Sequence, residues 1–198
     1  HGRNYAALCA VHLCLGDVRQ AIEAGQRMAD LGFPAFWLAL AHVANGEHER
    51  AVQIYWDMRL LLGSTFALPP GMPRLTDEAR DAYFTLTSRG VCSGDPEARA
   101  QYCAALDMLH QTMADPYDNT ISHPAIWMGH AELVMKIFGE RTTAVNIIGL
   151  MLLWADFDPI SRTVNHPDFM AFAERMGFVA AWQKYGWPDR LPRDPRLK

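Results

Sequence analysis

The sequence has no excess of positive charge and no long hydrophobic run. Its 198 residues carry a formal net charge of −4, which gives no basic surface for nucleic acid within this chain. The longest apolar run extends only from Ile147 to Trp154, far short of the roughly 20 residues of a membrane-spanning helix. The first residues do not resemble a signal peptide. We therefore expect a cytoplasmic protein that contacts neither nucleic acid nor a membrane.

Cysteine motifs for metal binding or redox chemistry are also missing. The four cysteines, Cys9, Cys14, Cys92 and Cys103, form no C-x-x-C pair. Cys9 and Cys14 are five residues apart on an expected helix, so they do not face each other. We interpret all four as free thiols in a reducing cytoplasm.

No catalytic motif is present. Ser88, Ser93 and Ser122 lack a G-x-S-x-G context, and the chain has no glycine-rich phosphate loop or dinucleotide-binding pattern. We expect no catalytic residues, no cofactor and a protein that is not an enzyme. An α-helical enzyme remains the least favoured alternative.

His123, His130 and Glu132 are the best candidates for a metal site. The two histidines are seven residues apart, about 10 Å along a helix axis, which is too far for both to bind one zinc ion. We place His123 at a helix start beside Pro124, and we expect no metal.

What the sequence does contain is a short pattern that occurs three times. It reads GDVRQAI from Gly16, GEHERAV from Gly46 and GERTTAV from Gly139, each with alanine five residues after the glycine. Glycine ends one helix in the left-handed conformation, and the acid that follows caps the next helix. The alanine must be small because the paired helices cross closely there. The pattern therefore predicts helical hairpins, the first two 30 residues apart.

Apolar residues at helical spacing extend this prediction along the chain. After the first two hairpins, glycine and proline predict a linker from Gly63 to Pro73, and a second loop from Ala114 to Pro124. The remaining helices are expected at Thr76–Arg89, Pro96–Met113, His123–Phe138 and Arg141–Trp154.

These hairpins resemble the tetratricopeptide repeat family. The resemblance rests on the turn glycines, on the crossing residues Ala21, Ala51 and Ala144, on the aromatic Tyr55 and on the terminating Pro34. The 30-residue spacing departs from the family's usual length of about 34, and Gly25 stands where an aromatic is expected. The resemblance implies an all-α fold, with antiparallel hairpins stacked as an α-solenoid and a C-terminal capping segment. An unrelated all-α bundle is the alternative.

The tail from Asn165 to Asp189 also resembles the ends of bacterial tetratricopeptide-type proteins. Such tails often follow repeats attached to a winged-helix or nucleotide cyclase domain. The resemblance therefore implies the repeat region of a bacterial regulator of transcription or signalling. Because the chain opens on His1-Gly2 without methionine, we expect it to be a piece of a larger protein. Phe169, Phe178 and Trp182 are expected to cover the apolar face left by the hairpin that ends at Trp154.

We thus expect one domain over residues 1–198. Its parts are two repeats (1–63), a linker with a divergent hairpin (64–121), a third repeat (122–156) and the cap (157–198).

The family resemblance implies a module that binds a protein or peptide partner in a concave groove. By position in the repeat, the groove-facing residues are Ala6, Ala10, Leu13, Phe36, Leu40 and Val43. Two alternatives stay open for the groove: it binds a small molecule or short peptide as a sensor domain, or the chain itself covers it. Assembly into a homo-oligomer is also open.

Overall fold

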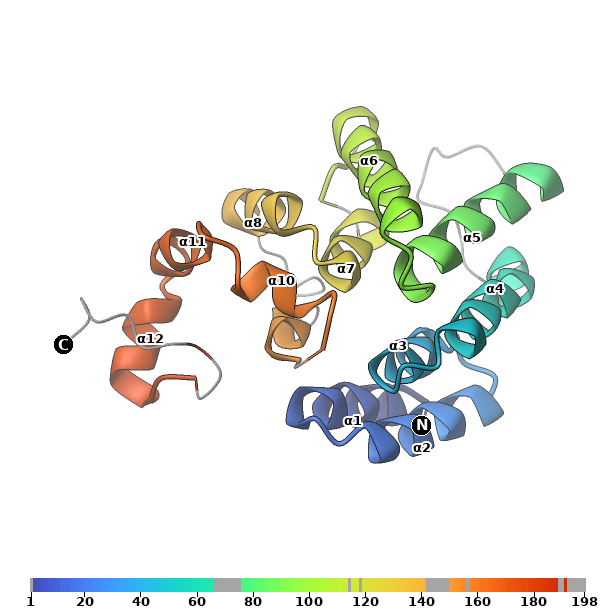
Figure 1. Cartoon of the computed structure of the whole chain (residues 1–198), viewed down its shortest axis with the longest axis horizontal. Coiled ribbons are helices and arrows are strands. Elements are labelled where there is room, and N and C mark those ends of the chain that lie inside the picture. The colour runs from blue at the N-terminus through green and yellow to red at the C-terminus, as the bar shows by residue number, and fades with distance from the viewer. Residues whose placement is uncertain are drawn as a thin grey trace.

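The chain is built from consecutive helices in the computed structural model, which describes residues 2–65, 76–113, 115–117, 119–141, 150–155, 157–188 and 191. Over these ranges there is no strand, and neighbouring helices pack against each other (Figure 1). The expected all-α class is confirmed. The helices are α1 (Gly2–Leu15), α2 (Val18–Asp30), α3 (Phe36–Ala44), α4 (His48–Thr65), α5 (Asp77–Cys92), α6 (Pro96–Thr112), α7 (Asn119–Met128), α8 (Ala131–Glu140), η1 (Met151–Trp154), α10 (Ser161–Val164), α11 (Phe169–Arg175) and α12 (Phe178–Tyr185).

The first two helix pairs are joined by turns of the same geometry. Gly16 and Gly46 have φ values of 74° and 76°, the left-handed conformation expected of them. The amide that follows each glycine donates a hydrogen bond of 2.9 Å to a histidine carbonyl oxygen, Asp17 to His12 and Glu47 to His42. These bonds satisfy carbonyl groups that the helix end would otherwise leave free.

Side-chain caps begin three helices where the sequence predicts them. Asp17 accepts a hydrogen bond from the Gln20 amide at the start of α2, and Asp95 accepts one from the Glu97 amide at the start of α6. Thr76 caps α5 through the Ala79 amide. The predicted helices over residues 76–89 and 96–113 are therefore confirmed, with small shifts in their ends.

The third hairpin differs from the prediction. The expected helix from His123 to Phe138 is two helices, α7 and α8, separated by Gly129 at φ 58°. The amides of Gly129 and His130 repeat the hydrogen-bond pattern of the first two turns. Gly139 lies inside α8 and has no positive φ, so placing the turn there was wrong.

His123 and Pro124 also lie within α7 rather than at a helix start. A proline inside a helix removes one backbone hydrogen bond. Complete burial of Ile121, Ala125 and Ile126 on the same helix offsets that cost. The crossing residue Ala144 and most of the predicted helix from Arg141 lie outside the described residues. Helix α4 continues to Thr65, past the predicted start of the linker at Gly63, and the rest of the predicted linker also lies outside the described residues.

Small residues occupy the helix crossings of the first two hairpins. Ala21 and Ala51 are both fully buried, as expected. Gly25 of α2 lies against α3: a Cβ atom placed on Gly25 would be 2.9 Å from the Leu38 Cα atom. Only glycine fits at this position, because the two helix backbones approach too closely for a side chain.

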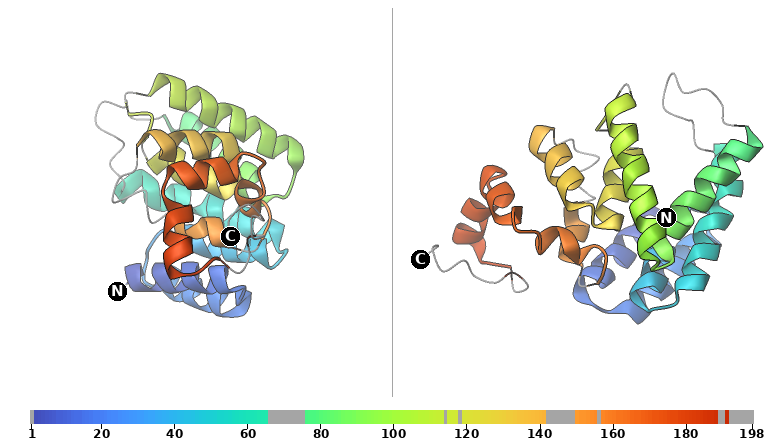
Figure 2. Two further views of the ribbon diagram at one scale, coloured as in Figure 1. Left: turned by 90° about the vertical axis from the view of Figure 1, so that its left-hand side faces the viewer. Right: turned by 45° about the horizontal axis from the view of Figure 1, so that its top comes forward.

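The two ends of the helical arc are brought together. Figures 1 and 2 show the helix pairs following one another around a curve, with η1 returning beside α1. Helix η1 contacts both α1 and α7. The Phe36 ring of α3 also packs on the Trp127 ring of α7, with 5.5 Å between the ring centroids. The inner side of the curve is thus partly filled by the chain itself.

Aromatic rings join the C-terminal segment to the rest of the chain. Trp154 of η1 contacts the rings of Phe169 and Trp182, at centroid distances of 6.3 Å and 5.7 Å. Phe169 and Phe172 are fully buried, and α11 packs on α8. The expected contact between the tail and Trp154 is therefore confirmed, with Phe178 reaching it through Phe172 and Trp182.

In the part of the chain that the structure describes, no helix combines the length and the hydrophobicity that crossing a membrane requires.

Candidate functional site

Most of the six predicted groove residues are not accessible. Ala10, Leu13, Leu40 and Val43 are buried, whereas Ala6 and Phe36 are half-buried. The buried positions lie on α1 and α3, the helices closed over by η1 and α7. Any partner that approaches this side of the two helices meets only Ala6 and Phe36 of the predicted set.

Phe36 belongs to an aromatic cluster that links four helices. Its ring contacts Tyr55 of α4 as well as Trp127 of α7, both at a centroid distance of 5.5 Å. Tyr55 in turn contacts Phe84 of α5 at 6.4 Å, and His123 contacts Trp127 at 6.1 Å. Edge-to-face and tilted aromatic contacts of this kind fix the relative positions of helices. The cluster therefore holds the inner side of the arc in shape.

The buried phenols and thiols of this interior keep their protons at neutral pH. Burial raises the pKa of the Tyr55 and Tyr102 phenols well above their ordinary value, and it raises the pKa of Tyr83 as well. Burial likewise raises the pKa of the Cys9 thiol to about 12. Cys9 and Cys92 are buried, Cys14 and Cys103 are half-buried, and none of the four is in a disulfide. Such groups are suited to packing rather than to proton transfer or nucleophilic attack.

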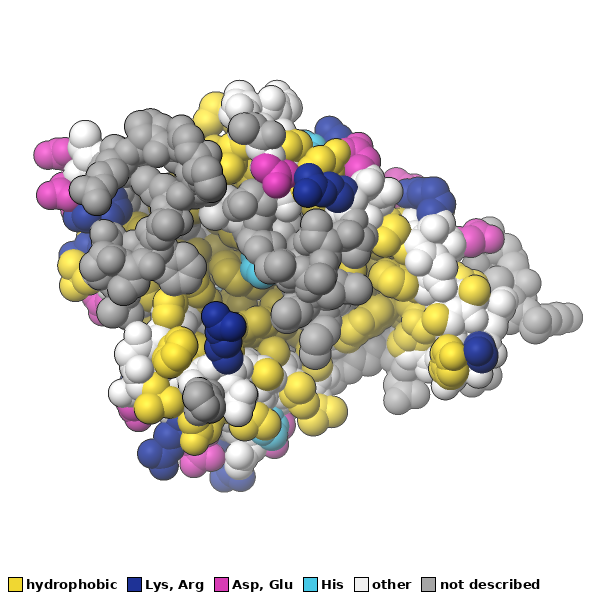
Figure 3. Space-filling model, turned by 180° about the vertical axis from the view of Figure 1, so that it is seen from behind, with side chains coloured by type: hydrophobic (Ala, Val, Ile, Leu, Met, Phe, Trp, Pro, Cys, Tyr) yellow, Lys and Arg dark blue, Asp and Glu magenta, His cyan; other side chains and the backbone are white. Residues whose placement is uncertain are grey.

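Hydrophobic side chains gather in a hollow on the face opposite to the one seen in Figure 1. Figure 3 shows them on the floor of this hollow, with a basic side chain beside it. A concave apolar floor is typical of surfaces that bind a partner.

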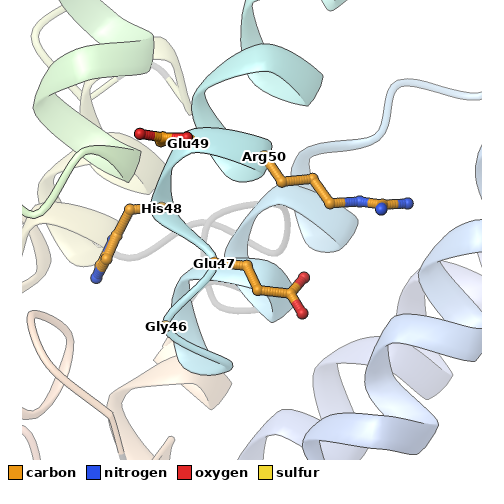
Figure 4. Close-up of a pocket in the computed structure, with 5 residues that line it drawn as sticks. All are labelled: Gly46, Glu47, His48, Glu49 and Arg50. Carbon is orange, nitrogen blue, oxygen red and sulfur yellow. The ribbon is translucent and has the colours of Figure 1, made fainter.

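The first turn of α4 borders an open depression of about 530 Å³, lined among the described residues by Gly46, Glu47, His48, Glu49 and Arg50. Its side chains do not converge: Glu47 and Arg50 extend to one side, and His48 and Glu49 to the other (Figure 4). The His48 Nδ1 atom lies 2.8 Å from the Cys92 carbonyl oxygen. That hydrogen bond joins the turn to the next hairpin and occupies the His48 side chain. Because the lining side chains also point in different directions, the depression has no set of groups aimed at one ligand.

Glu47 also has a structural partner. Its carboxylate lies 2.5 Å from Nδ1 of the buried His42 and accepts a hydrogen bond from Asn45. The hydrogen bond with His42 lowers the pKa of Glu47 below its ordinary value. The first hairpin has a looser version, with 4.0 Å between His12 Nδ1 and an Asp17 oxygen. A histidine–acid contact across the turn is thus a shared feature of the two hairpins.

The candidate metal residues are dispersed. The His130 Nε2 atom lies 2.9 Å from an Asp107 oxygen, His123 lies against Trp127, and Glu132 is exposed on α8. Among the residues that the structure describes, no three His, Cys, Asp or Glu side chains gather closely enough to hold a metal ion.

A second cavity, of about 250 Å³, lies between α2 and α4. Most of its lining is apolar, including Phe33, Leu38, Ile54 and Met58, and Arg50 and Asp57 supply opposite charges. A cavity of this size and lining fits a small apolar group with a polar end.

Sequence reasoning missed the aromatic cluster because its members come from separate hairpins. Phe36 and Trp127 each have the helical spacing of ordinary core residues, so no local pattern pairs them. The turn at Gly129 was missed because Val134 stands five residues after it, where the first two hairpins have alanine.

The chain was also compared with known proteins. No protein-family model, no curated protein and no solved structure matches it.

Proposed function

We propose that this chain is a non-catalytic module for protein–protein interaction, a tetratricopeptide-like α-solenoid from a larger bacterial regulatory protein. One observation carries the proposal. The hairpins α1–α2 and α3–α4 repeat the same turn conformation and the same buried alanine at a spacing of 30 residues, and each places a histidine near an acid across the turn.

Arrays of this kind present extended surfaces to partner proteins, because each repeat contacts mainly its neighbours and leaves its other faces free. The apolar interior, with buried phenols whose pKa is raised, and the dispersed titratable side chains also favour binding over chemistry. The role in a bacterial regulator rests on the resemblance of the tail alone, and the cytoplasmic location rests on the interpretation of the four cysteines as free thiols.

The test is a selection of displayed peptides against the purified chain. We expect peptides that bind saturably and compete with one another, and that raise the melting temperature by mass action. A heat-unfolded sample of the same chain is the control for nonspecific adsorption. If no peptide is enriched over that control, the proposal is wrong.

The α2–α4 cavity favours a second function, a sensor domain that binds a small molecule. A thermal-shift screen with metabolites separates the two functions, because a true ligand of this cavity stabilises the fold. Ile54→Trp, which fills the cavity from the half-buried side of α4, should abolish such a shift and leave the binding of selected peptides unchanged. If a metabolite still raises the melting temperature of this variant, the metabolite does not bind in the cavity.

A further inference from the structure

The outer face of α1 carries an exposed apolar stripe. The exposed fractions of Leu8, Val11 and Leu15 are 47%, 41% and 69%. These positions are spaced by three and four residues, so they lie on one side of the helix. The contacts of α1 with α2, α3 and η1 leave this side uncovered. Leucine and valine at such spacing usually mark a face that packs on another element.

The internal repeat shows that the same face of the next hairpin is covered. Thirty residues further on, Leu38 and Ala41 of α3 correspond to Leu8 and Val11 of α1. Leu38 is 3% exposed and Ala41 is fully buried. The face that is exposed on α1 is therefore buried on α3.

Helix α2, the second helix of the preceding hairpin, covers Leu38. A Cβ atom on Gly25 would lie 3.0 Å from the Leu38 Cβ atom and 2.9 Å from the Leu38 Cα atom. Ala29, four residues after Gly25, borders the same cavity as Leu38. Leu38 thus packs on small residues of the helix that comes immediately before α3 in the chain. The repeat places the equivalent helix immediately before α1, within the same polypeptide.

We infer that the Leu8–Val11 face of α1 is an internal interface of the array, covered by one more helix that is formed by the residues preceding His1 in the larger protein. This helix is the equivalent of α2 and carries glycine or alanine where it crosses Leu8. The α2–α3 interface, continued one step toward the N-terminus, places the helix there. Asn45, the equivalent of Leu15, is exposed, so the contact is centred on Leu8 and Val11. The inference rests on the proposed function, because it lengthens the proposed array, and it assigns this face to packing within one chain.

The residues encoded before His1 give the most direct test. Thirty residues before Gly25 is the sixth residue before His1, and thirty residues before Ala21 is the tenth. We expect glycine or alanine at both positions, on a segment whose other apolar residues have helical spacing. A larger residue at the sixth position, or an initiating methionine between it and His1, would overturn the inference.

A lengthened chain tests the packing itself. A copy of residues 17–35, which contain α2, its cap and the turn after it, is joined to Ala6 in place of residues 1–5. The copied Gly32 then stands at the position of Gly2, where a glycine leaves room for the Phe33 ring. We expect the melting temperature to rise by at least about 4 °C, because each added repeat interface stabilises its neighbour.

Gly25→Leu in the copied helix alone is the matched control. The added side chain prevents the close crossing, while leucine favours the helix itself more than glycine does. This substitution should remove the rise, as should Leu8→Glu together with Val11→Glu in the lengthened chain. In the chain without the copy, the same double substitution should change the melting temperature little, because both side chains are exposed there.

Three results would overturn the inference. The first is a lengthened chain whose melting temperature does not rise, and the second is an equal rise with Gly25→Leu in the copy. The third is a dimer of the chain without the copy, detected by light scattering, that Leu8→Glu and Val11→Glu dissociate, since a second copy of the protein would then occupy the face.

The two proposals fail separately. If displayed peptides bind but the added helix gives no rise, the array ends at α1 and the interaction module stands. If the added helix gives the rise but no displayed peptide is enriched, the array continues before α1 and the interaction function is wrong.

Discussion

The first two hairpins and the C-terminal segment are packed in opposite ways. In α1–α4 the helices approach closely over Gly25, Ala21 and Ala51. In α11 and α12 large rings such as Phe172 and Trp182 fill the space between short helices. Close backbone approach requires small residues at fixed positions, whereas aromatic filling adapts to irregular geometry. The first two hairpins can therefore be predicted from sequence spacing, whereas spacing does not predict how the tail packs.

The comparison predicts that removal of the tail has the largest effect. Deletion of residues 165–198 takes away the fully buried Phe169 and Phe172 and uncovers Trp154. Each such aromatic contributes roughly 1.5–3 kcal/mol through burial, against a total of about 5–15 kcal/mol for a domain. We expect aggregation or a strongly lowered melting temperature, measured by size-exclusion chromatography and thermal melts.

A matched pair of point substitutions gives a milder form of that experiment. Phe172→Ala should cost about 3–5 kcal/mol, and Tyr185→Ala almost nothing, because Tyr185 is 78% exposed. A soluble, equally stable truncated monomer would show that the tail is a separate binding arm and not part of the core.

Enlarging a crossing residue tests the close packing of the hairpins. Ala51→Leu should overpack the contact between paired helices and cost about 1–3 kcal/mol. The neighbouring Arg50 is exposed, so Arg50→Leu should change the denaturant midpoint little. Equal effects of the two substitutions would contradict the assigned crossing.

Two glycines test where the third turn lies. Gly46→Ala should cost about 1–2 kcal/mol from backbone strain alone, since φ is 76° and no atom lies within 4 Å of the added methyl group. Gly139→Ala should instead stabilise the chain by about 0.5–1 kcal/mol, because Gly139 lies inside α8 and the nearest atom, on Phe172, is 4.0 Å away. Urea denaturation measures both. If Gly139→Ala destabilises the chain, the third turn lies at Gly139, as the sequence pattern had predicted.

The smallest effect concerns pH. The pKa of Glu47 is lowered in the folded chain by its hydrogen bond with His42, so this bond stabilises the fold above the ordinary glutamate pKa. The contribution disappears as the pH falls through the lowered value. Glu47→Gln should therefore narrow the difference between denaturant midpoints at neutral and acidic pH. Asp30→Asn, at an exposed carboxylate of α2, is the control and should leave that difference unchanged.

The sequence predicted those turns and helix starts that are determined by residues close to them in the chain. Left-handed glycines at Gly16 and Gly46, the cap at Asp17 and the starts of α5 and α6 each depend on a few neighbouring residues. The third turn was misplaced because GERTTAV copies the pattern inside a helix, where burial of Val134, Ile137 and Phe138 on one face keeps α8 continuous through Gly139.

The surfaces depended on long-range packing and were harder to predict. Repeat position selected residues of α1 and α3 for a groove, but it could not show that most of them are buried, with η1 against α1 and Trp127 of α7 against Phe36. The exposure of Leu8 and Val11 likewise follows from what lies beside α1 in space, and no local pattern encodes it.

The contact between α1 and η1 has a consequence for how the chain folds. In a string of hairpins that contact only their neighbours, each unit can reach its final structure soon after synthesis. Here the first helix packs against residues 151–154, so its last native contacts cannot form until nearly four-fifths of this 198-residue sequence has been made. Contacts of such high sequence separation slow folding. The packing of α1 is therefore completed only when η1 is in place, even though the hairpins between them are assembled from local contacts.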